Sequence, residues 1–284
     1  LERCYEDIDA ISMHNYYGNM PELTGGSTAR YLAMNLDMER QIRNIAGICD
    51  EVQAQLGSTK KLWLAFDEWN IWYRAREPEH MDGHLQVAPR LLEEEYNLED
   101  ALLVGGFLNS LMRHSDRVRI ACMAQLVNVI APLVTNDEGV LRQSIYYPYA
   151  WALEYARGRV LDLAVESDSY PITAEGLRPD FARDDMVPYL DVAATLDEEN
   201  ARASIFILNR DLDAERDVTI RWQGLQPAGV LSCETLTGSD LKAMNTFTQP
   251  HRVAPRALDT PQPGQAMTIK VPAAAYTVLN LAVD

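Results

Sequence analysis

Glu68 is the residue best placed to carry out chemistry. With its neighbour Asp67 it follows the apolar run 62–66, and Trp72 and other aromatic residues lie close by in the sequence. Two acids at the end of a buried strand are costly unless they have partners or a function. Indole rings suit the C–H faces of a sugar ring, so this group suggests a carboxylate that acts on a sugar. The alternative is a structural acid that caps a loop beside core aromatic residues.

Two other apolar runs also end in polar residues. Tyr16 follows the run 8–13, and Gln125 lies at the end of the run 118–126. If the three runs are neighbouring strands, the Tyr16 hydroxyl can reach Glu68, and Gln125 can hydrogen-bond a sugar hydroxyl. Each residue alone is a weak signal, because polar residues commonly end such strands. A Tyr, a Glu and a Gln at one end of a sheet together favour a binding site.

The remaining polar clusters are weaker candidates. His80 and His84 are four residues apart, but Pro78 and Gly83 argue against a helix there, and a metal site needs further ligands. We therefore expect a solvated loop and no metal. The run 93–95 of three glutamates is interpreted as a solvated face.

The first half of the chain alternates apolar runs with helical patterns. Continuous apolar strands between amphipathic helices predict a parallel sheet covered by helices, with ligands at the carboxyl ends of the strands. Asn97, with Asp100 three residues on, has the pattern of a helix N-cap. The expected elements are strands at 8–13, 62–66 and 118–126, and helices ending at Gly57, running from Asn97 to about His114, and covering 143–156.

The sequence changes character near Gly158. Helical periodicity is lost, and short β-branched runs separated by Gly, Pro, Asn and Asp take its place, which is typical of an antiparallel β-sandwich. We place two domains at 1–157 and 158–284. The strands expected in the second domain are 189–194, 203–208, 217–222, 229–235, 267–271 and 276–282.

Composition excludes several classes of protein. A net charge of −17 disfavours nucleic acid as a partner, because phosphates would be repelled. No apolar run reaches the ~18 residues of a membrane span, so no membrane is expected. The four cysteines are widely spaced and form no zinc motif, which predicts buried, reduced thiols and a reducing compartment.

Three parallel strands cannot close a barrel, and left open they expose two unpaired edges. A complete eight-stranded barrel takes about 250 residues. The chain begins just before a strand. We expect either a small independent α/β domain or, preferably, a barrel whose preceding strands are missing or belong to another chain. A structural barrel half whose edges drive self-association is a further alternative.

Three stretches resemble family 51 of the glycoside hydrolases. Residues 66–73 are similar to the family's nucleophile motif, 11–19 to its preceding barrel strand, and 124–132 to its final strand and loop. The likeness is weaker in the sandwich, at 206–210 and 274–279. It implies a chain of the α/β plus all-β class: the last three or so strand–helix units of a (β/α)₈ TIM barrel, followed by a jelly-roll-like β-sandwich.

The resemblance also assigns roles to the candidate residues. Glu68 matches the catalytic nucleophile, Tyr16 the tyrosine that touches the nucleophile and the sugar, and Gln125 a glutamine at the sugar site. Trp72 matches an aromatic residue near the pocket, and His14 lies at the pocket edge.

One departure from the family is important. The family's general acid/base is the Glu of a Gly-Asn-Glu motif, and no such motif occurs here, since Gly18-Asn19 is followed by Met20. The resemblance therefore implies that the chain starts near the sixth barrel strand and that the acid/base lies upstream. A chain without that group is expected to be inactive alone on natural substrates.

The expected activity is exo-hydrolysis, with retention, of terminal α-L-arabinofuranosyl groups from arabinan, arabinoxylan or their oligosaccharides, without a cofactor. A xylosidase or endoglucanase of the same family and a non-catalytic carbohydrate-binding fragment stay open. The family implies a homo-oligomer, often a hexamer, and the missing N-terminal barrel half is another expected partner. The family resemblance and the reduced thiols together imply a cytoplasmic location.

Overall fold

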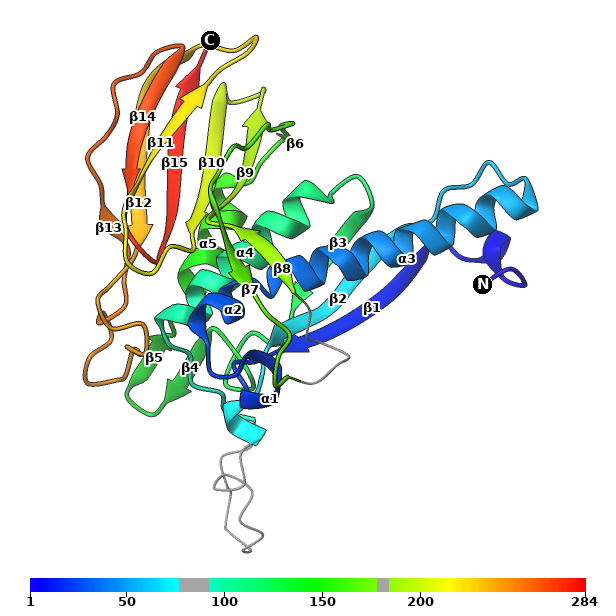
Figure 1. Cartoon of the computed structure of the whole chain (residues 1–284), viewed down its shortest axis with the longest axis horizontal. Helices are drawn as coiled ribbons and strands as arrows, with labels where there is room; N and C mark the ends of the chain where they lie inside the picture. The colour runs from blue at the N-terminus through cyan, green and yellow to red at the C-terminus, as the bar shows by residue number, and fades with distance from the viewer. Residues whose placement is uncertain (77–91, 178–183) are drawn as a thin grey trace, which may run out of the picture.

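A three-stranded parallel sheet forms the first part of the molecule (Figure 1). Its order is β1 (Ala10–Tyr17), β2 (Trp63–Ile71), β3 (Val118–Met123). Helix α3 (Asn35–Leu56) connects β1 to β2, and α4 (Leu98–Arg113) leads into β3. These strand–helix connections confirm the parallel sheet expected from the sequence. The computed structural model describes residues 1–76, 92–177 and 184–284.

The helices form where the sequence signals placed them. The apolar face of α3 is buried, and Gly57 ends the helix in the left-handed conformation, with φ 61°. Helix α4 begins with a capping box, in which Asn97 accepts from the backbone of Asp100 and the Asp100 side chain accepts in return. The other helices are η1 (Tyr5–Asp7), α1 (Pro21–Thr24), α2 (Thr28–Leu32), η2 (Arg74–Arg76) and α5 (Tyr146–Tyr155). None of the helices that the structure describes is long and apolar enough to cross a membrane.

The expected strand ends were wrong in three places. Strand β1 continues through Tyr17 and β2 through Ile71, so His14, Tyr16 and Glu68 lie within strands rather than after them. Strand β3 is shorter than expected and ends at Met123. Where one face of a sheet is exposed, polar residues alternate with buried ones along the strand. In the sequence these polar residues resemble a loop, so the end of the strand is placed too early.

The second part is an antiparallel β-sandwich, as predicted. A six-stranded sheet has the order β13-β12-β15-β10-β9-β6, and the pair β11-β14 packs on one of its faces. Ile205, Ile207, Leu279 and Leu281 meet Ile269 in the core between these layers. The strands are β6 (Arg159–Val160), β9 (Leu190–Asp197), β10 (Arg202–Asn209), β11 (Arg216–Arg221), β12 (Pro227–Leu236), β13 (Arg256–Ala257), β14 (Ala266–Val271) and β15 (Ala275–Val283).

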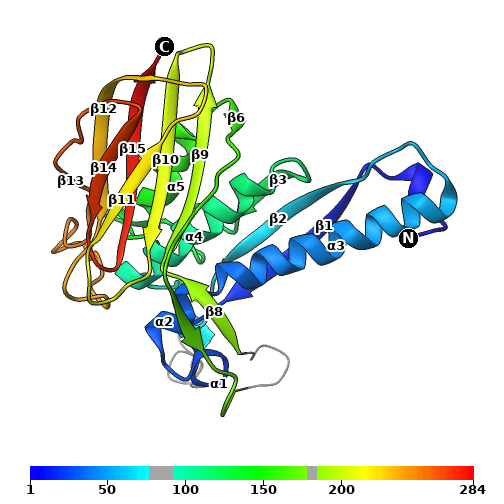
Figure 2. The ribbon, with the colours of Figure 1, turned by 45° about the horizontal axis from the view of Figure 1, so that its top comes forward.

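Helix α4 lies between the parallel sheet and the sandwich (Figures 1 and 2). It is buried along almost its whole length and touches β2 on one side and β9, β10 and β15 on the other. The outer face of the six-stranded sheet therefore packs against α4 through Phe206, Leu208, Tyr276 and Val278. Both views show the α3 arm reaching away from the sandwich. Two small ribbons, β4 (Leu133–Asn136) with β5 (Gly139–Arg142) and β7 (Ser169–Ile172) with β8 (Asp185–Pro188), complete the fold.

The close approach of α4 to the sandwich depends on Gly105. A Cβ at this position would lie 2.6 Å from Cε2 and 2.7 Å from Cγ of Tyr276, which is fully buried. We expect Gly105→Ala to lower the free energy of unfolding by about 1–3 kcal/mol, because the rigid ring cannot move away without repacking the junction. Denaturant unfolding of the purified chain measures this.

Gly47 is the matched control for this substitution. It also lies in a helix interior, but a Cβ there would meet nothing within 4 Å. Gly47→Ala is expected to stabilise the protein by about 0.5–1 kcal/mol, because alanine loses less backbone entropy in a helix. Equal effects of the two substitutions would show that the Gly105–Tyr276 contact does not constrain the fold.

The cysteines differ in part from expectation. Cys49 and Cys233 are buried, but Cys4 and Cys122 are exposed, and all four are free. Cys122 lies on β3, which is an edge strand of the described sheet with most of its residues exposed. The sequence predicts β3 as a buried strand. It is exposed because it is the last strand of the described sheet and has no neighbour on its outer side.

Candidate active site

A β-bulge brings Asp67 and Glu68 to one face of the parallel sheet. The pairing advances three residues along β2, from Ala65 to Glu68, while it advances two along β1, from Ser12 to His14. Adjacent residues of a regular strand point to opposite faces, and an extra residue in one strand removes that alternation. Both acids can therefore meet the same side chain of β1.

Each oxygen of the Glu68 carboxylate faces a residue of β1. The Tyr16 hydroxyl donates to Oε1 at 2.5 Å, and His14 Nδ1 lies 3.3 Å from Oε2. Residues 12, 14 and 16 share the exposed face of β1, whereas Met13 and Tyr17 point into the core. The Glu68 side chain is 40% exposed, so it is held in place and still accessible to a ligand.

Asp67 is held in the same way on its own side of His14. The Ser12 hydroxyl donates to Asp67 Oδ1 at 2.8 Å, and His14 Nε2 lies 3.4 Å from the same oxygen. The hydrogen bond from Ser12 is the main cause that lowers the pKa of Asp67 below its ordinary value. Asp67 is therefore an ionised carboxylate at neutral pH.

The loop after β2 positions Trp72. Its ring meets Tyr16 edge to face, with centroids 5.3 Å apart, and its backbone N–H donates to Tyr17. Beyond it, the backbone N–H groups of residues 73–75 donate to the buried carboxylate of Glu94. The interpretation of residues 93–95 as a solvated face was thus wrong for Glu94. Burial is the main cause that raises its pKa, and the three backbone donors explain why an acid is tolerated there.

Gln125 lies just beyond β3, next to the end of β2. Its backbone N–H donates to Ile130, and its side chain is exposed, with no hydrogen bond to Glu68 or His14 within the described residues. Fully buried Asn70 fixes this loop, donating at 2.5 Å to the backbone oxygens of both Ala124 and Ile130. The structure therefore brings Glu68, Tyr16, His14 and Trp72 together and leaves Gln125 at the rim.

Several residues that hold the candidate site in place were not predicted from the sequence. Ser12 and Asn70 are polar residues within strands, and neither has a signal that separates it from any other polar residue of a strand. Asp67 was noted only as a neighbour of Glu68. His80 and His84 lie outside the described residues. Within the ranges that the structure describes, no group of three or more His, Cys, Asp or Glu side chains could hold a metal ion.

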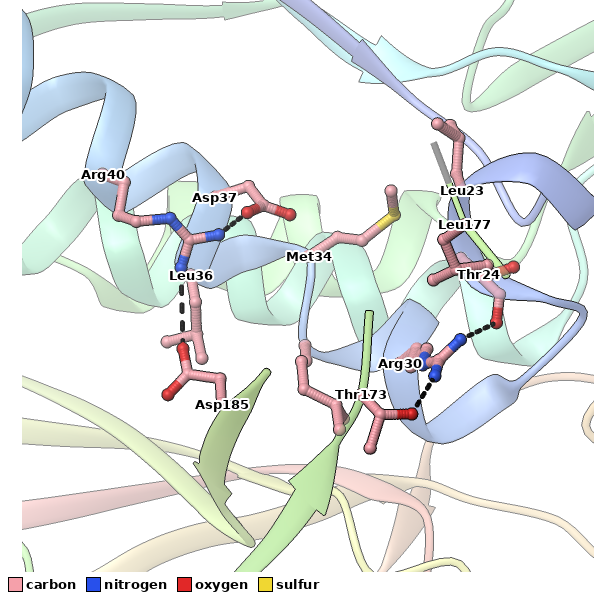
Figure 3. Close-up of a pocket in the computed structure, with 12 residues that line it drawn as sticks. Leu23, Thr24, Arg30, Met34, Leu36, Asp37, Arg40, Thr173, Leu177 and Asp185 are labelled. Atoms are coloured by element: carbon pink, nitrogen blue, oxygen red, sulfur yellow. Dashed lines mark hydrogen bonds and ion pairs between the residues drawn. The ribbon is translucent and has the colours of Figure 1, made fainter. Parts of the chain in front are cut away.

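A separate hollow lies between helices α1–α3 and the β7–β8 ribbon, away from these residues (Figure 3). Its own side chains bridge it. Arg30 donates to Thr173 at 2.8 Å, and Arg40 pairs with Asp37 and, at 3.9 Å, with Asp185. These contacts link the ribbon to the helices. The hollow is therefore a packing gap between the helices and the ribbon, and none of the candidate residues lines it.

The arrangement around Glu68 is suited to nucleophilic chemistry. A phenol and an imidazole hold the two oxygens of an accessible carboxylate, and an aromatic wall stands beside it. Donors of this kind orient a carboxylate and stabilise its negative charge. An accessible carboxylate oriented in this way has the chemistry of a nucleophile.

Comparison with known proteins places the chain in a family. Residues 67–275 match the α-L-arabinofuranosidase C-terminal domain. The chain is 38% identical over 263 residues to an intracellular exo-α-(1→5)-L-arabinofuranosidase of Halalkalibacterium halodurans, covering 91% of this chain and 50% of the relative. It is 39% identical over 246 residues to a second such protein, from Bacillus subtilis, covering 86% and 46%.

A solved structure is similar along almost the whole chain. It is a family 51 α-L-arabinofuranosidase from Bifidobacterium longum, with a TM-score of 0.85 and 31% identity, covering 99% of this chain and 54% of that one. The chain therefore spans about half the length of the proteins that it matches.

Proposed function

The chain belongs to the family of the α-L-arabinofuranosidase C-terminal domain, and from this premise we propose that it carries the nucleophile half of a retaining α-L-arabinofuranosidase site. Glu68 attacks the anomeric carbon and forms a covalent glycosyl-enzyme. Tyr16 and His14 orient its carboxylate, Trp72 stacks on the sugar, and Gln125 at the rim hydrogen-bonds a sugar hydroxyl. The observation that carries the proposal is the pair of contacts at Glu68, Tyr16 on Oε1 and His14 on Oε2.

The second carboxyl of the reaction must come from elsewhere. A retaining glycosidase needs an acid/base about 5–5.5 Å from the nucleophile, protonated when it meets the leaving oxygen. Asp67 shares His14 with Glu68, but its lowered pKa keeps it ionised, so it is unsuited to that role. We place the acid/base in the part of the relatives' length that this chain does not span.

The same reasoning extends to the architecture. We propose that residues 1–157 supply the last strands of a (β/α)₈ TIM barrel and that 158–284 form the C-terminal sandwich, of jelly-roll type. The parallel order β1-β2-β3 and the open polar face beside Glu68 support this, because a barrel would enclose that face. The missing N-terminal half of the barrel is then a required partner.

The relatives are named exo-acting and intracellular, and we extend both properties to this protein. The substrate is then a terminal α-L-arabinofuranosyl group on an oligosaccharide or polysaccharide, and the compartment is the cytoplasm. A homo-oligomer is proposed from the family alone.

The test compares nitrophenyl glycosides with the chain alone and with added polypeptide that supplies the other barrel strands. We expect turnover of the α-L-arabinofuranoside only in the assembled protein, because the chain alone lacks the acid/base. Faster release from a β-D-xyloside or a cello-oligosaccharide would favour the xylosidase or the endoglucanase. Binding of arabino-oligosaccharides without turnover in the assembled protein would favour a carbohydrate-binding role.

A further inference from the structure

Ser12 and Asp67 have no part in the reaction as described, yet both contact the residue that faces the nucleophile. The Ser12 hydroxyl lies 2.8 Å from Asp67 Oδ1 and 3.4 Å from His14 Nε2. It lies on the same face of β1 as His14, and Asp67 is brought there by the bulge in β2. The four side chains Ser12, Asp67, His14 and Glu68 thus form a continuous polar chain that ends at the nucleophile.

The hydrogen-bond donors among these four side chains can be assigned in order. Asp67 is ionised and can only accept, so the single proton of Ser12 is committed to it. The Ser12 oxygen is then an acceptor toward His14, and a proton on His14 Nε2 satisfies both Ser12 and Asp67. With Nε2 held by Ser12 and Asp67, the other ring nitrogen, Nδ1, faces Glu68 Oε2, 3.3 Å away.

We propose that Asp67 is a positioning residue for the nucleophile, acting through Ser12 and His14. Together Ser12 and Asp67 hold Nε2 of His14 and so fix the orientation of its ring. This directs Nδ1 at Glu68 and holds the carboxylate in line for attack. The inference rests on the proposed role of Glu68, because a positioned carboxylate matters only if it is the reacting group.

Among the residues that the structure describes, the side chains around His14 give no competing anchor. On β1 its neighbours on the same face are Ser12 and Tyr16, and Tyr16 is directed at the other oxygen of Glu68. From α3, Gln41 reaches the backbone oxygen of His14 and not its ring. Within the described residues, the polar contacts of the ring are thus those to Ser12, Asp67 and Glu68.

The first measurement is the ring ¹⁵N spectrum of histidine-labelled protein, with the His14 signals identified by their loss in His14→Gln. In the wild type, the Nε2–H proton of His14 is expected to exchange slowly with water, because Ser12 and Asp67 accept from it. In Asp67→Ala and Ser12→Ala, it is expected to exchange faster. Unchanged exchange of this proton in both variants would overturn the proposal, and this readout does not depend on activity.

The second measurement is turnover of nitrophenyl α-L-arabinofuranoside by the assembled enzyme. Asp67→Ala is expected to lower kcat by about 10- to 100-fold with KM nearly unchanged, because the nucleophile is misplaced and the binding groups remain. Asp67→Asn keeps an oxygen that accepts from Ser12, so it is expected to retain more activity than Asp67→Ala and guards against a folding defect. The charge-matched control is Asp116→Ala. Asp116 is an exposed acid just before β3, at the opposite end of the sheet from His14.

The outcomes separate this inference from the proposed function. Glu68-dependent turnover that Asp67→Ala and Ser12→Ala leave unchanged would overturn the positioning role and leave the arabinofuranosidase intact. A wild type that does not turn over the substrate in the assembled protein would overturn the arabinofuranosidase role, while the ring spectra would still report whether Ser12 and Asp67 fix His14. A rise in KM with kcat unchanged would assign Asp67 to substrate binding and contradict the proposal.

Discussion

Glu68→Ala in the assembled enzyme is expected to lower kcat on nitrophenyl α-L-arabinofuranoside by at least about 10⁴-fold. The substitution removes the group that forms the covalent intermediate, and the other residues of the site cannot replace it. Tyr16 and His14 then face an empty space in place of the carboxylate. Initial-rate kinetics at saturating substrate measure the effect.

A matched control separates chemistry from folding. Glu51 is an exposed glutamate on α3, and Glu51→Ala is expected to leave kcat within about twofold, as surface substitutions do. Glu68→Gln keeps the shape of the side chain and is expected to be as inactive as Glu68→Ala, because an amide is a poor nucleophile. Substantial turnover by a folded Glu68→Gln protein would contradict the assignment.

Arg210→Met is expected to lower the free energy of unfolding by about 3–5 kcal/mol, the usual cost of breaking a buried ion pair from one side. The guanidinium is 1% exposed and donates to Asp191, to Asn35 and to the backbone oxygens of Leu32 and Pro188. It therefore joins the sandwich to the elements around α3. Methionine fills the space but leaves all four acceptors without this donor.

The effect of Arg210→Met is centred on Asp191, where the sandwich meets α4. Asp191 is also paired with Arg113 of α4. Burial opposes its ionisation, but the guanidinium groups of Arg210 and Arg113 outweigh this and hold the pKa of Asp191 well below its usual range. Removing Arg210 leaves a buried negative charge with one cation in place of two.

Denaturant unfolding measures the effect, with Arg252→Met as the control. Arg252 pairs with Asp240 at 2.7 Å, but both side chains are about half exposed, at 49% and 53%. Exposed ion pairs contribute about 0–1 kcal/mol, so this control should unfold almost like the wild type. Similar small losses in both variants would mean that Arg210 does not hold the two parts together.

The sequence predicted the elements well where local signals were strong. The Asn97 capping box and the glycine at position 57 mark helix ends through their own backbone chemistry, and both were confirmed. The longer sandwich strands were found because β-branched runs between turn residues have few other solutions, whereas the two-residue strands β6 and β13 were missed. Strand ends in the first half were missed, because the polar residues of β1 and β2 look like loop residues until the open face of the sheet is known.

The sequence named members of the candidate site but not its geometry. Glu68, Tyr16 and Trp72 were singled out from residue type and position, and the structure places them in contact through Tyr16. The bulge that turns Asp67 to the same face depends on the register between β1 and β2, which no local pattern specifies. The role of Glu94 was missed for the same kind of reason, since its backbone partners lie about twenty residues away.

Chemical rescue of Glu68→Ala tests the central claim most directly. In the assembled enzyme with nitrophenyl α-L-arabinofuranoside, azide can enter the space left by the carboxylate and attack the anomeric carbon as nitrophenolate leaves. The account predicts that azide restores nitrophenol release and that the product is the β-L-arabinofuranosyl azide, with inverted configuration. An α-azide would assign Glu68 to the acid/base role, and rescue of Asp67→Ala but not of Glu68→Ala would move the nucleophile to Asp67. Either result would contradict the account.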